Sequence, residues 1–419
     1  MSLGQISKNQ IDVSRVAGDQ PPESDVLDVH AVLLVNYVRP HHVVSYQALA
    51  KRVRKLTVLL SVAMEPDRAW EAEWSELDVR VQKNWMFTSK WKHSTGFSED
   101  NFIHLPIDTT KQLKSLDPDI VFSYEMGIRT LLSSWFRRFN PRVPLVLVGN
   151  MSDHIEKERG ALRRGLRWMI RRGVDYFTYN GPSCKRYFRS LAISEDRLFH
   201  LPYCIDPGKV FTGQRSIESA SRESVRRLLY CGALSSRKGI HKFTQCLREY
   251  CDSHPEQIVE LSIAGSGPQQ HEIKNCATSN LAIKFLGNCD RQELRAAYGA
   301  TDICVFPTLA DEWGLVPIEA LASGVPVLGS VFAQSVEAVV EEAKNGWAFD
   351  PTDVQTMQSA IDRAMKCSSA KLAEMGAYGK QSVAHISGEA TAEKFCGIIE
   401  EVLPEIKTLD GQKAQEHPQ

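Results

Sequence analysis

Short apolar, β-rich runs alternate with helical segments along most of the chain, and this alternation constrains the fold most strongly. In the front half the apolar runs are nearly continuous, as buried parallel strands should be. They span 31–36, 56–62, 119–124, 144–149 and 174–179. Helical patterns lie between them, at 42–53, 109–116, 126–138, 156–172 and 182–191. Strands that alternate with helices predict a parallel sheet covered by helices on both faces.

The stretch TGQRSIESASRES (212–224) has almost no apolar residues, which indicates a linker. The alternation then restarts, with strands expected at 228–232, 259–265, 282–287, 302–307, 325–330 and 346–349. Helices are expected near 240–251, 291–299, 316–322, 334–341 and 353–366, then at 369–384 and 389–403. Because 419 residues are too many for one compact core, we predict an α/β protein of two Rossmann-like domains. A ligand is expected between them, at the carboxyl ends of the strands.

These patterns also set the expected limits of the domains. A polar, disordered tail comes first and a loose tail comes last. The predicted units are a tail (1–28), a first Rossmann-like domain (29–208), a linker (209–224), a second Rossmann-like domain (225–388), a C-terminal helix (389–404) and a tail (405–419).

Charge and cysteine usage indicate the compartment in which the protein is expected. The first predicted domain has 27 Lys and Arg residues against 19 Asp and Glu, whereas the chain from Lys209 onward has 21 against 27. The ten cysteines all follow residue 183 and form no C-x-x-C pair, which favours a reducing compartment. The start, MSLGQISKNQ, lacks the apolar core of a signal peptide, and no apolar run is long enough to span a bilayer. We therefore expect a cytoplasmic protein.

Two motifs in the second half place glycines and cations after strands. In YCGALSSRKGIHKF, Gly232 lies in the turn, and Arg237 and Lys238 precede a helix. Cations beside a helix N-terminus form a site for phosphate oxygens, although Lys-Gly before a helix is more often a solvated start. In LSIAGSGPQQHEI, Gly265 and Gly267 allow a ligand to approach the backbone closely, but an ordinary turn has the same residues. The full G-x-G-x-x-G spacing is missing, so a dinucleotide fingerprint is not supported.

A third motif, FPTLADEWGLVPIEALASGVPV, places carboxylates around the start of a helix. Asp311 and Glu312 lie on the loop after a strand, and Gly314 removes a side chain where that loop passes a ligand. Pro317 fits the first helical turn, which also contains Glu319. Taken singly, such acids more often cap a helix or face solvent.

In this order the motifs resemble the donor-binding domain of family-four retaining glycosyltransferases, which have the two-domain GT-B architecture. The resemblance is specific from Leu228 to Met365 and includes LGNCDRQELRAAYGATDICVFPT. Over 29–208 only the order of the elements is compatible. The phrase YCIDPGKV is similar to the family's turn before the second domain, with Asp206 in its acidic position.

The resemblance implies a role for each matching position. Asp311 would hydrogen-bond hydroxyls of the donor sugar, Glu319 the nucleotide ribose, and Lys238 the diphosphate. Backbone N–H groups around Gly314 and Leu315 would add donors. The other donor-binding positions would be Gly232, Arg237, Gly265, Gly267, Leu286, Gly287, Glu312 and Trp313, with 286–288 lining the base.

Two positions depart from the family pattern. The family usually has Glu at the first acidic position, and Asp311 is one methylene shorter; Glu312 beside it is a substitute to consider. The family often has a basic residue directly after the glycine of the first turn, where this chain has Ala233. Arg237 is the cation that could compensate.

In the resemblance, the first domain holds the acceptor and one catalytic side chain, often a His after a strand. The candidates are Asp153 and His154 in GNMSDHIEKERG, and the pair His41-His42 after the first strand. A lone His is more often a satisfied packing residue. The sequence Asp117-Pro-Asp119 has a D-x-D metal pattern but immediately precedes a strand, so no metal is expected.

The predicted helix 156–172 is amphipathic. An apolar stripe contains Leu162, Leu166, Met169 and Ile170, and a basic ridge contains Arg159, Arg163, Arg167 and Arg171. Together with TLLSSWFRRFNPR (130–142), the ridge suits an anionic membrane surface. A solvated face over a core stripe is an equal alternative, and nucleic acid is not expected.

The predicted function is transfer of a sugar, with retention, from a UDP-, GDP- or ADP-sugar to a hydroxyl of a glycan or lipid-linked acceptor. This would serve polysaccharide, lipopolysaccharide or glycolipid synthesis, without a cofactor, in the cytoplasm or peripherally on the inner membrane face. The alternatives are a nucleotide-sugar epimerase or hydrolase of the same fold, and a non-catalytic subunit that binds nucleotide-sugars.

Overall fold

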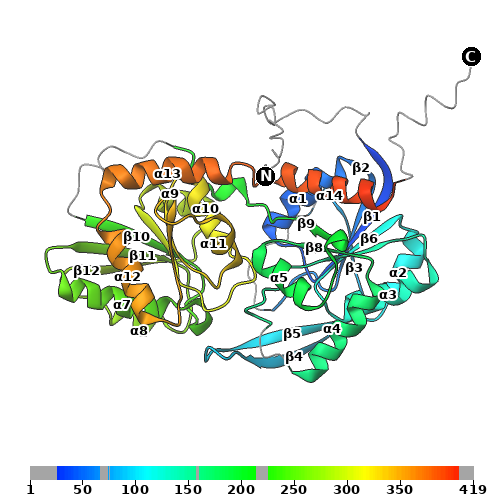
Figure 1. Ribbon diagram of the computed structural model, residues 1–419, viewed down its shortest axis with the longest axis horizontal. Helices are drawn as coiled ribbons and strands as arrows, with labels where there is room; N and C mark the ends of the chain where they lie inside the picture. Colours follow the sequence, from blue (N-terminus) through cyan, green and yellow to red (C-terminus); the bar gives the residue numbers. More distant parts are fainter. Residues whose placement is uncertain (1–25, 67–73, 75, 157–159, 214–224, 405–419) are drawn as a thin grey trace, which may run out of the picture.

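The computed structural model describes residues 26–66, 74, 76–156, 160–213 and 225–404. These residues form two α/β domains that lie side by side (Figure 1). Each domain is built on its own parallel sheet, as the alternation predicted. The first sheet has seven strands, two more than predicted, and the second has the six that were predicted. The predicted tails and linker lie largely outside the described residues, although Leu27 and Asp28 already belong to the first strand.

The first sheet has the strand order β3-β2-β1-β6-β7-β8-β9. Its strands are β1 (Leu27–Val35), β2 (Val53–Leu60), β3 (Asp78–Val81), β6 (Ile120–Tyr124), β7 (Leu145–Val148), β8 (Tyr176–Tyr179) and β9 (Leu198–His200). The helices of this part are α1 (Pro40–Ala50), α2 (Thr109–Leu116), α3 (Ile128–Phe139), α4 (Ala161–Gly173) and α5 (Pro182–Ser190). The central strands are buried from end to end, which explains their continuous hydrophobicity.

The second sheet has the order β12-β11-β10-β13-β14-β15. Its strands are β10 (Val225–Cys231), β11 (Ile258–Ala264), β12 (Leu281–Gly287), β13 (Ile303–Phe306), β14 (Val327–Ser330) and β15 (Gly346–Phe349). The helices that follow them are α7 (Ile240–Ser253), α8 (Gln270–Lys274), α9 (Arg291–Gly299), α10 (Val316–Ala322), α11 (Gln334–Val339), α12 (Val354–Met365), α13 (Ser369–Val383) and α14 (Gly388–Val402). Most of these bounds differ from the predicted ones by three residues or fewer.

Both sheets reverse their strand order in the middle. The first reverses between β1 and β6, and the second between β10 and β13. At such a point the loops after the two neighbouring strands run in opposite directions and leave a crevice for a ligand. The loops after β10 and β13 contain the Arg-Lys and Asp-Glu motifs.

The last helix returns to the first domain. Helix α14 lies beside α1 (Figure 1), and its Phe395 and Ile399 are part of the first domain's core. The Phe395 ring meets that of Phe122 edge-on, with centroids 5.1 Å apart. The C-terminal segment therefore ties the two domains together.

A β-hairpin absent from the sequence prediction joins the first domain to the second. Strands β4 (Asn84–Lys92) and β5 (Ser98–Pro106) pair antiparallel. Near their connection, Trp91 and Phe97 pack with Ile155 of the first domain and with Leu309 and Ala310 of the second. The alternation of Trp85, Phe87 and Trp91 is a period-two signal that could have revealed β4.

All ten cysteines lie within the described residues as free thiols, and seven of them are buried. They fill apolar space in the manner of small hydrophobic residues.

Candidate functional site

Lys238 and Asp311 meet at the point where the second sheet reverses. Lys238 ends a short 3-10 helix, η4 (Ser236–Lys238), which follows β10. Asp311 lies on the loop after β13, the neighbour of β10 in the sheet. The Lys238 ammonium donates a hydrogen bond to Oδ2 of Asp311, and both side chains are largely buried. Two residues 73 positions apart thus form one ion pair at the carboxyl edge.

The two charges of this pair support each other. Burial by itself would raise the pKa of Asp311, but Lys238 and Arg237 outweigh burial and hold the pKa below its ordinary value. Burial lowers the pKa of Lys238, and the attraction of Asp311 opposes that shift. Asp311 is therefore ionised at neutral pH, and its carboxylate is available to accept hydrogen bonds.

Arg237 makes a second pair, which crosses between the domains. Its Nε donates to Oε2 of Glu99 on β5 at 2.6 Å, and the Ser235 hydroxyl donates to Oε1 of Glu99 at 3.2 Å. Nη1 of Arg237 also donates to the Ala310 carbonyl, directly before Asp311. Arg237 therefore points towards the Lys238–Asp311 pair.

Glycine is required where the loops of this edge touch. Gly239 has φ +67°, and a Cβ there would lie 2.1 Å from the Pro307 carbonyl oxygen. A Cβ on Gly265, with φ +143°, would lie 2.0 Å from the carbonyl oxygen of Gly232. The glycines therefore let the turns after β10, β11 and β13 pack together. The other predicted glycines with positive φ at this edge are Gly232, Gly267, Gly287 and Gly314.

Glu319 lies on the first turn of α10, as predicted, but it has its own partners. It is buried and accepts a hydrogen bond from the Tyr298 hydroxyl at 3.3 Å. The ammonium of Lys209 lies 3.7 Å from its Oε1. Burial raises the pKa of Glu319, and Lys209 opposes that shift. Asp311 and Glu319 thus both lie in the segment from β13 to α10, at the same edge of the sheet, but they are paired with different residues.

The residues predicted to line a base lie at the end of β12. Leu286 is exposed. The Gly287 carbonyl accepts a hydrogen bond from Gly265 N at 2.6 Å, and the Ser266 hydroxyl donates to Oδ1 of Asn288 at 3.1 Å. The turns after β11 and β12 are therefore held against each other, with an apolar side chain open to solvent.

Glu312 points into the first domain and does not substitute for Asp311. Its Oε2 accepts from Nδ2 of Asn150, which follows β7, at 3.0 Å. Burial raises the pKa of Glu312 to about 7, with repulsion from Glu125 as the next cause and Arg39 opposing. Glu125 has a left-handed backbone, with φ +67°, which is uncommon for a residue other than glycine. Trp313, the next residue, is buried.

Known proteins resemble this second domain in sequence. Residues 214–382 match the sequence model of the family described as Glycosyl transferases group 1. The second domain belongs to this glycosyltransferase family. The matching region contains both cations, both acids and the glycine turns described above.

Named relatives match part of this chain over part of their own length. The D-inositol 3-phosphate glycosyltransferase of Corynebacterium urealyticum is 26% identical over 219 residues, which is 49% of this chain and 50% of that protein. The glycogen synthase of Mycobacterium tuberculosis is 33% identical over 143 residues, 33% of this chain and 34% of that protein. The chain thus spans half the length of the first relative and a third of the second.

Solved glycosyltransferase structures extend the likeness to both domains. HepE of Anabaena, in complex with UDP, has a TM-score of 0.66 and 16% identity, covering 89% of this chain and all of that one. Sucrose-phosphate synthase of Thermosynechococcus elongatus has a TM-score of 0.62 and 15% identity, covering 90% and 99%. At these identities the likeness concerns the fold, which is GT-B, as the resemblance implied.

The two predicted catalytic residues of the first domain have different surroundings. Asp153 pairs with Arg186, Nε to Oδ2 at 2.7 Å, and Arg186 also pairs with Glu337 of the group 1 domain. Asp153 therefore braces the two domains. His154 stacks on Phe332 with ring centroids 3.6 Å apart, and the Phe332 carbonyl accepts from Asp311 N at 3.3 Å. Of the two, His154 is the one that lies next to the loop containing Asp311.

His41 and His42 lie in the first turn of α1 and not on a loop, contrary to the expectation, and Tyr203 contacts both of their rings and also that of Trp313 in the group 1 domain. Both are buried on α1, and burial lowers both pKa values well below the ordinary range. The His42 ring stacks on Tyr46 and on Tyr203. Both rings are therefore neutral and packed, but neither ring nitrogen of His42 has a hydrogen-bond partner among the described residues, so it is not the satisfied packing residue of the alternative.

Asp117 and Asp119 lie at the amino end of β6, opposite to the edge of the site. Asp119 accepts from the His30 backbone N at 2.7 Å, and Arg54 contacts the same carboxylate at 3.1 Å. Among the described residues, no group of three or more His, Cys, Asp or Glu is placed to hold a metal ion.

The predicted arginine ridge over an apolar stripe on α4 is present only in part. Ile170 is buried and Leu166 packs against the core, as predicted, but Leu162 and Met169 are exposed and the arginines turn inwards. Arg167 is 5% exposed and donates to the Met126 carbonyl and to Glu156. Arg163 also pairs with Glu156, and Arg171 donates to the Leu191 carbonyl. Leu162 of the predicted stripe is instead 91% exposed. Arg159 lies outside the described residues.

The arginines turn inwards because a buried carboxylate and free backbone carbonyls need donors more than the core needs these apolar groups. In the part of the chain that the structure describes, no helix combines the length and apolarity that crossing a membrane requires.

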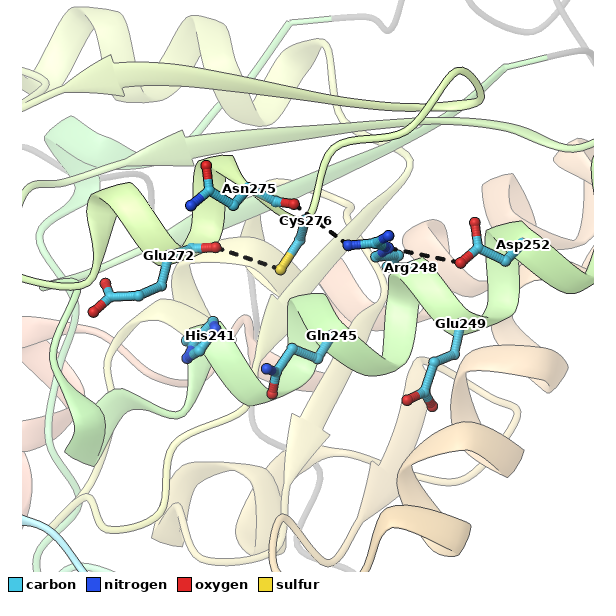
Figure 2. A pocket seen from close by; sticks show the side chains of 8 residues that line it. All are labelled: His241, Gln245, Arg248, Glu249, Asp252, Glu272, Asn275 and Cys276. Atoms are coloured by element: carbon cyan, nitrogen blue, oxygen red, sulfur yellow. Dashed lines mark hydrogen bonds and ion pairs between the residues drawn. The ribbon is translucent and has the colours of Figure 1, made fainter.

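A surface depression of about 580 Å³ lies between α7 and α8 (Figure 2). Polar side chains line it, and Arg248 reaches Asp252 of its own helix and the Asn275 carbonyl. None of the predicted site residues lies there. Its lining has one arginine against three carboxylates, those of Glu249, Asp252 and Glu272.

Sequence reasoning missed the partners that complete the site. Glu99 and Ser235 surround Arg237, and Tyr298 and Lys209 hold Glu319. No motif marks Glu99, because its importance depends on the hairpin that brings it to the other domain. Lys209 could have been noticed, since it lies in the phrase YCIDPGKV, shortly after Asp206.

Proposed function

We propose that the protein is a retaining glycosyltransferase of family four that uses a nucleotide-diphosphate-sugar as donor. The observation that carries the proposal is the convergence of Arg237, Lys238 and Asp311 at the reversal point of the second sheet, facing the first domain. Two cations beside a turn of backbone N–H groups bind a diphosphate. A carboxylate adjacent to them accepts hydrogen bonds from sugar hydroxyls.

The donor's parts are assigned along the same edge. Lys238 and Arg237 hold the diphosphate, with backbone donors at Gly314 and Leu315, and Asp311 selects the sugar. Glu319 hydrogen-bonds the ribose, and its contacts with Tyr298 and Lys209 orient its carboxylate. The base lies against Leu286 and Gly287. The donor is a UDP-, GDP- or ADP-sugar; HepE was solved with UDP, which favours testing UDP-sugars first.

The transfer step requires charge stabilisation more than a covalent intermediate. As the bond from the anomeric carbon to the diphosphate oxygen breaks, negative charge grows on that oxygen, and Lys238 and Arg237 stabilise it. The incoming hydroxyl attacks from the same face and gives its proton to the departing phosphate. His154, stacked beside Phe332, is the first-domain residue that we assign to position the acceptor. Asp153 contributes by bracing the domains.

We further propose a glycan or lipid-linked acceptor, in polysaccharide, lipopolysaccharide or glycolipid synthesis on the cytoplasmic side. The acceptor enters from the first domain, where Arg39, Glu125 and Asn150 follow strands β1, β6 and β7 and face Glu312. Carboxylates and amides at this position select a polar, hydroxyl-bearing acceptor.

The test begins with donor binding. The thermal unfolding temperature is measured with UDP, GDP and ADP and with their sugar derivatives, for the wild type, Lys238→Met and Asp311→Asn. At least one nucleoside diphosphate should stabilise the wild type and not Lys238→Met. Asp311→Asn should keep the response to the nucleotide and lose the additional response to its sugar derivative. Lys274→Met, an exposed change on α8, is the matched control.

Turnover is then followed as nucleotide release, with and without a panel of glycan and lipid acceptors, and the anomeric configuration of the product is read by NMR. Release without acceptor would indicate a hydrolase or epimerase, and binding without release a non-catalytic subunit. If no nucleotide stabilises the wild type, the proposal is wrong.

A further inference from the structure

Helices α3 and α4 expose large apolar side chains on the outside of the first domain. The two helices pack against each other and lie together in Figure 1. The exposed residues, with their exposed fractions, are Trp135 (59%), Phe139 (63%), Leu162 (91%), Trp168 (48%) and Met169 (47%). We call them the outer aromatic face. Neighbouring exposed groups of this size mark an interaction surface more often than a solvated one.

The two faces of α4 do not separate into an apolar inside and a charged outside: Ile170 is buried in the core, but so is Arg167. Arg163 and Arg167 reach inwards to Glu156, whereas Leu162 and Met169 of the same helix point outwards. A solvated helix would place the arginines outside and the leucine inside. The outside of α4 therefore mixes exposed apolar side chains with the exposed Arg164 and Arg172, a combination that suits an interface between water and an apolar medium.

The charge on these helices identifies the medium. Together α3 and α4 contain eight arginines and neither Asp nor Glu. Among them, Arg138, Arg164 and Arg172 are exposed, and the Arg172 guanidinium lies 3.6 Å from the centroid of the Trp168 ring. A second copy of this face would bring like charges together, which disfavours a symmetric dimer. Apolar aromatic groups among cations fit the interface of an anionic bilayer.

The hairpin continues the apolar exposure next to α3. Strand β5 packs on α3, and Phe87 lies opposite Ile103 in the ribbon with Trp85 on the same face. All three side chains are exposed.

The face is also connected to the site. Glu156, which fixes Arg163 and Arg167 of α4, lies two residues after His154. The orientation of α4 is therefore set by the segment that stacks on the group 1 domain.

We propose that the outer aromatic face docks the protein on an anionic phospholipid bilayer, with Trp135, Phe139 and Trp168 in the interface and Arg138 and Arg164 on the headgroups. The inference deepens the proposed function, since it names the surface at which a lipid-linked acceptor is met, and it rests on that function only for the acceptor. The arginine ridge of the sequence prediction is replaced by a different set of residues.

The experiment is flotation of the full chain with vesicles of phosphatidylcholine alone and vesicles that also contain phosphatidylglycerol. The wild type should bind the anionic vesicles and not the neutral ones. Arg138→Glu with Arg164→Glu should weaken binding about tenfold or more, since each basic residue near the surface contributes on the order of a fivefold factor. Lys274→Glu with Arg295→Glu, two exposed changes in the second domain, should leave binding unchanged.

A third variant has Trp135, Phe139 and Trp168 each changed to Ser. It should no longer bind the anionic vesicles, although its net charge is unchanged. The proposal would be overturned if the wild type does not bind anionic vesicles, or if the variants bind them as well as the wild type does. Sedimentation of a wild-type dimer that this variant abolishes would overturn it in favour of a second copy.

Nucleotide-induced thermal stabilisation is measured in the same variants and should be unchanged, which also shows that they fold. Nucleotide binding without vesicle binding would refute docking alone. Vesicle binding without any nucleotide binding would refute the proposed function alone.

Discussion

Glu99 is the carboxylate with which a bound diphosphate must compete, so its replacement by glutamine should strengthen nucleotide binding. In the structure Glu99 accepts hydrogen bonds from Arg237 and Ser235, both in the turn that we assign to the diphosphate. The Arg237 and Glu99 side chains are only 23% and 29% exposed, so solvent screens their attraction weakly. Donor binding has to break or stretch this contact and also approach a negative charge.

The size of the effect follows from the bonds that change. Glutamine keeps the shape of the side chain and can still accept a hydrogen bond from the charged guanidinium of Arg237. What the replacement removes is the attraction between opposite charges, about 1–2 kcal/mol for a pair that is only partly exposed. This corresponds to a gain in affinity of about 5- to 30-fold.

The assay is calorimetric titration with whichever of UDP, GDP and ADP the wild type binds. Asp100→Asn is the matched control, because it removes one negative charge from the adjacent, exposed position of the same hairpin. The corresponding nucleoside, which has no phosphate, should bind Glu99→Gln and the wild type equally. If Glu99→Gln binds the nucleoside diphosphate no more tightly than Asp100→Asn does, the competition argument is refuted.

Three further predictions concern stability, measured by denaturant unfolding. Arg167→Ala should destabilise the protein by about 3 kcal/mol, because it removes one partner of the buried Glu156. Arg164→Ala, on the outside of α4, is the control and should change stability by less than about 0.5 kcal/mol. Equal effects of the two changes would contradict the inward orientation of Arg167. The folded pKa of Glu312 is raised from 4.5 to about 7, so the folded protein holds a proton that the unfolded chain has released in this window. Stability should therefore fall as pH rises from about 4.5 to 7, by at most about 3 kcal/mol in total, and Glu312→Gln should remove this slope; an unchanged slope would exclude Glu312 as its source. Gly239→Ala should cost more than about 2 kcal/mol, because the left-handed backbone and the Pro307 carbonyl both oppose a Cβ, while Gly165→Ala, with open space around it, should be neutral or stabilising.

Local sequence patterns were sufficient for the framework of the protein. Continuous apolar runs placed the central strands of both sheets, since burial on two faces requires hydrophobic residues at every position. The order of turns, cations and acids placed Lys238 and Asp311 after β10 and β13. Parallel strands bring their carboxyl ends to one edge, and the two residues form the ion pair found there.

Tertiary structure decided the contacts between residues that are distant in the chain. Glu99 lies 138 positions from Arg237, and only the hairpin that crosses between the domains brings them together. The burial of individual α4 residues was likewise undetermined by the helical period, because Arg167 is buried beside Ile170 while Leu162 and Met169 of the predicted stripe are exposed. Here a buried carboxylate, Glu156, and free backbone carbonyls drew the arginines inwards. Leu162, Trp168 and Met169 were left outside, where the proposed bilayer would receive them, while Ile170 stayed in the core.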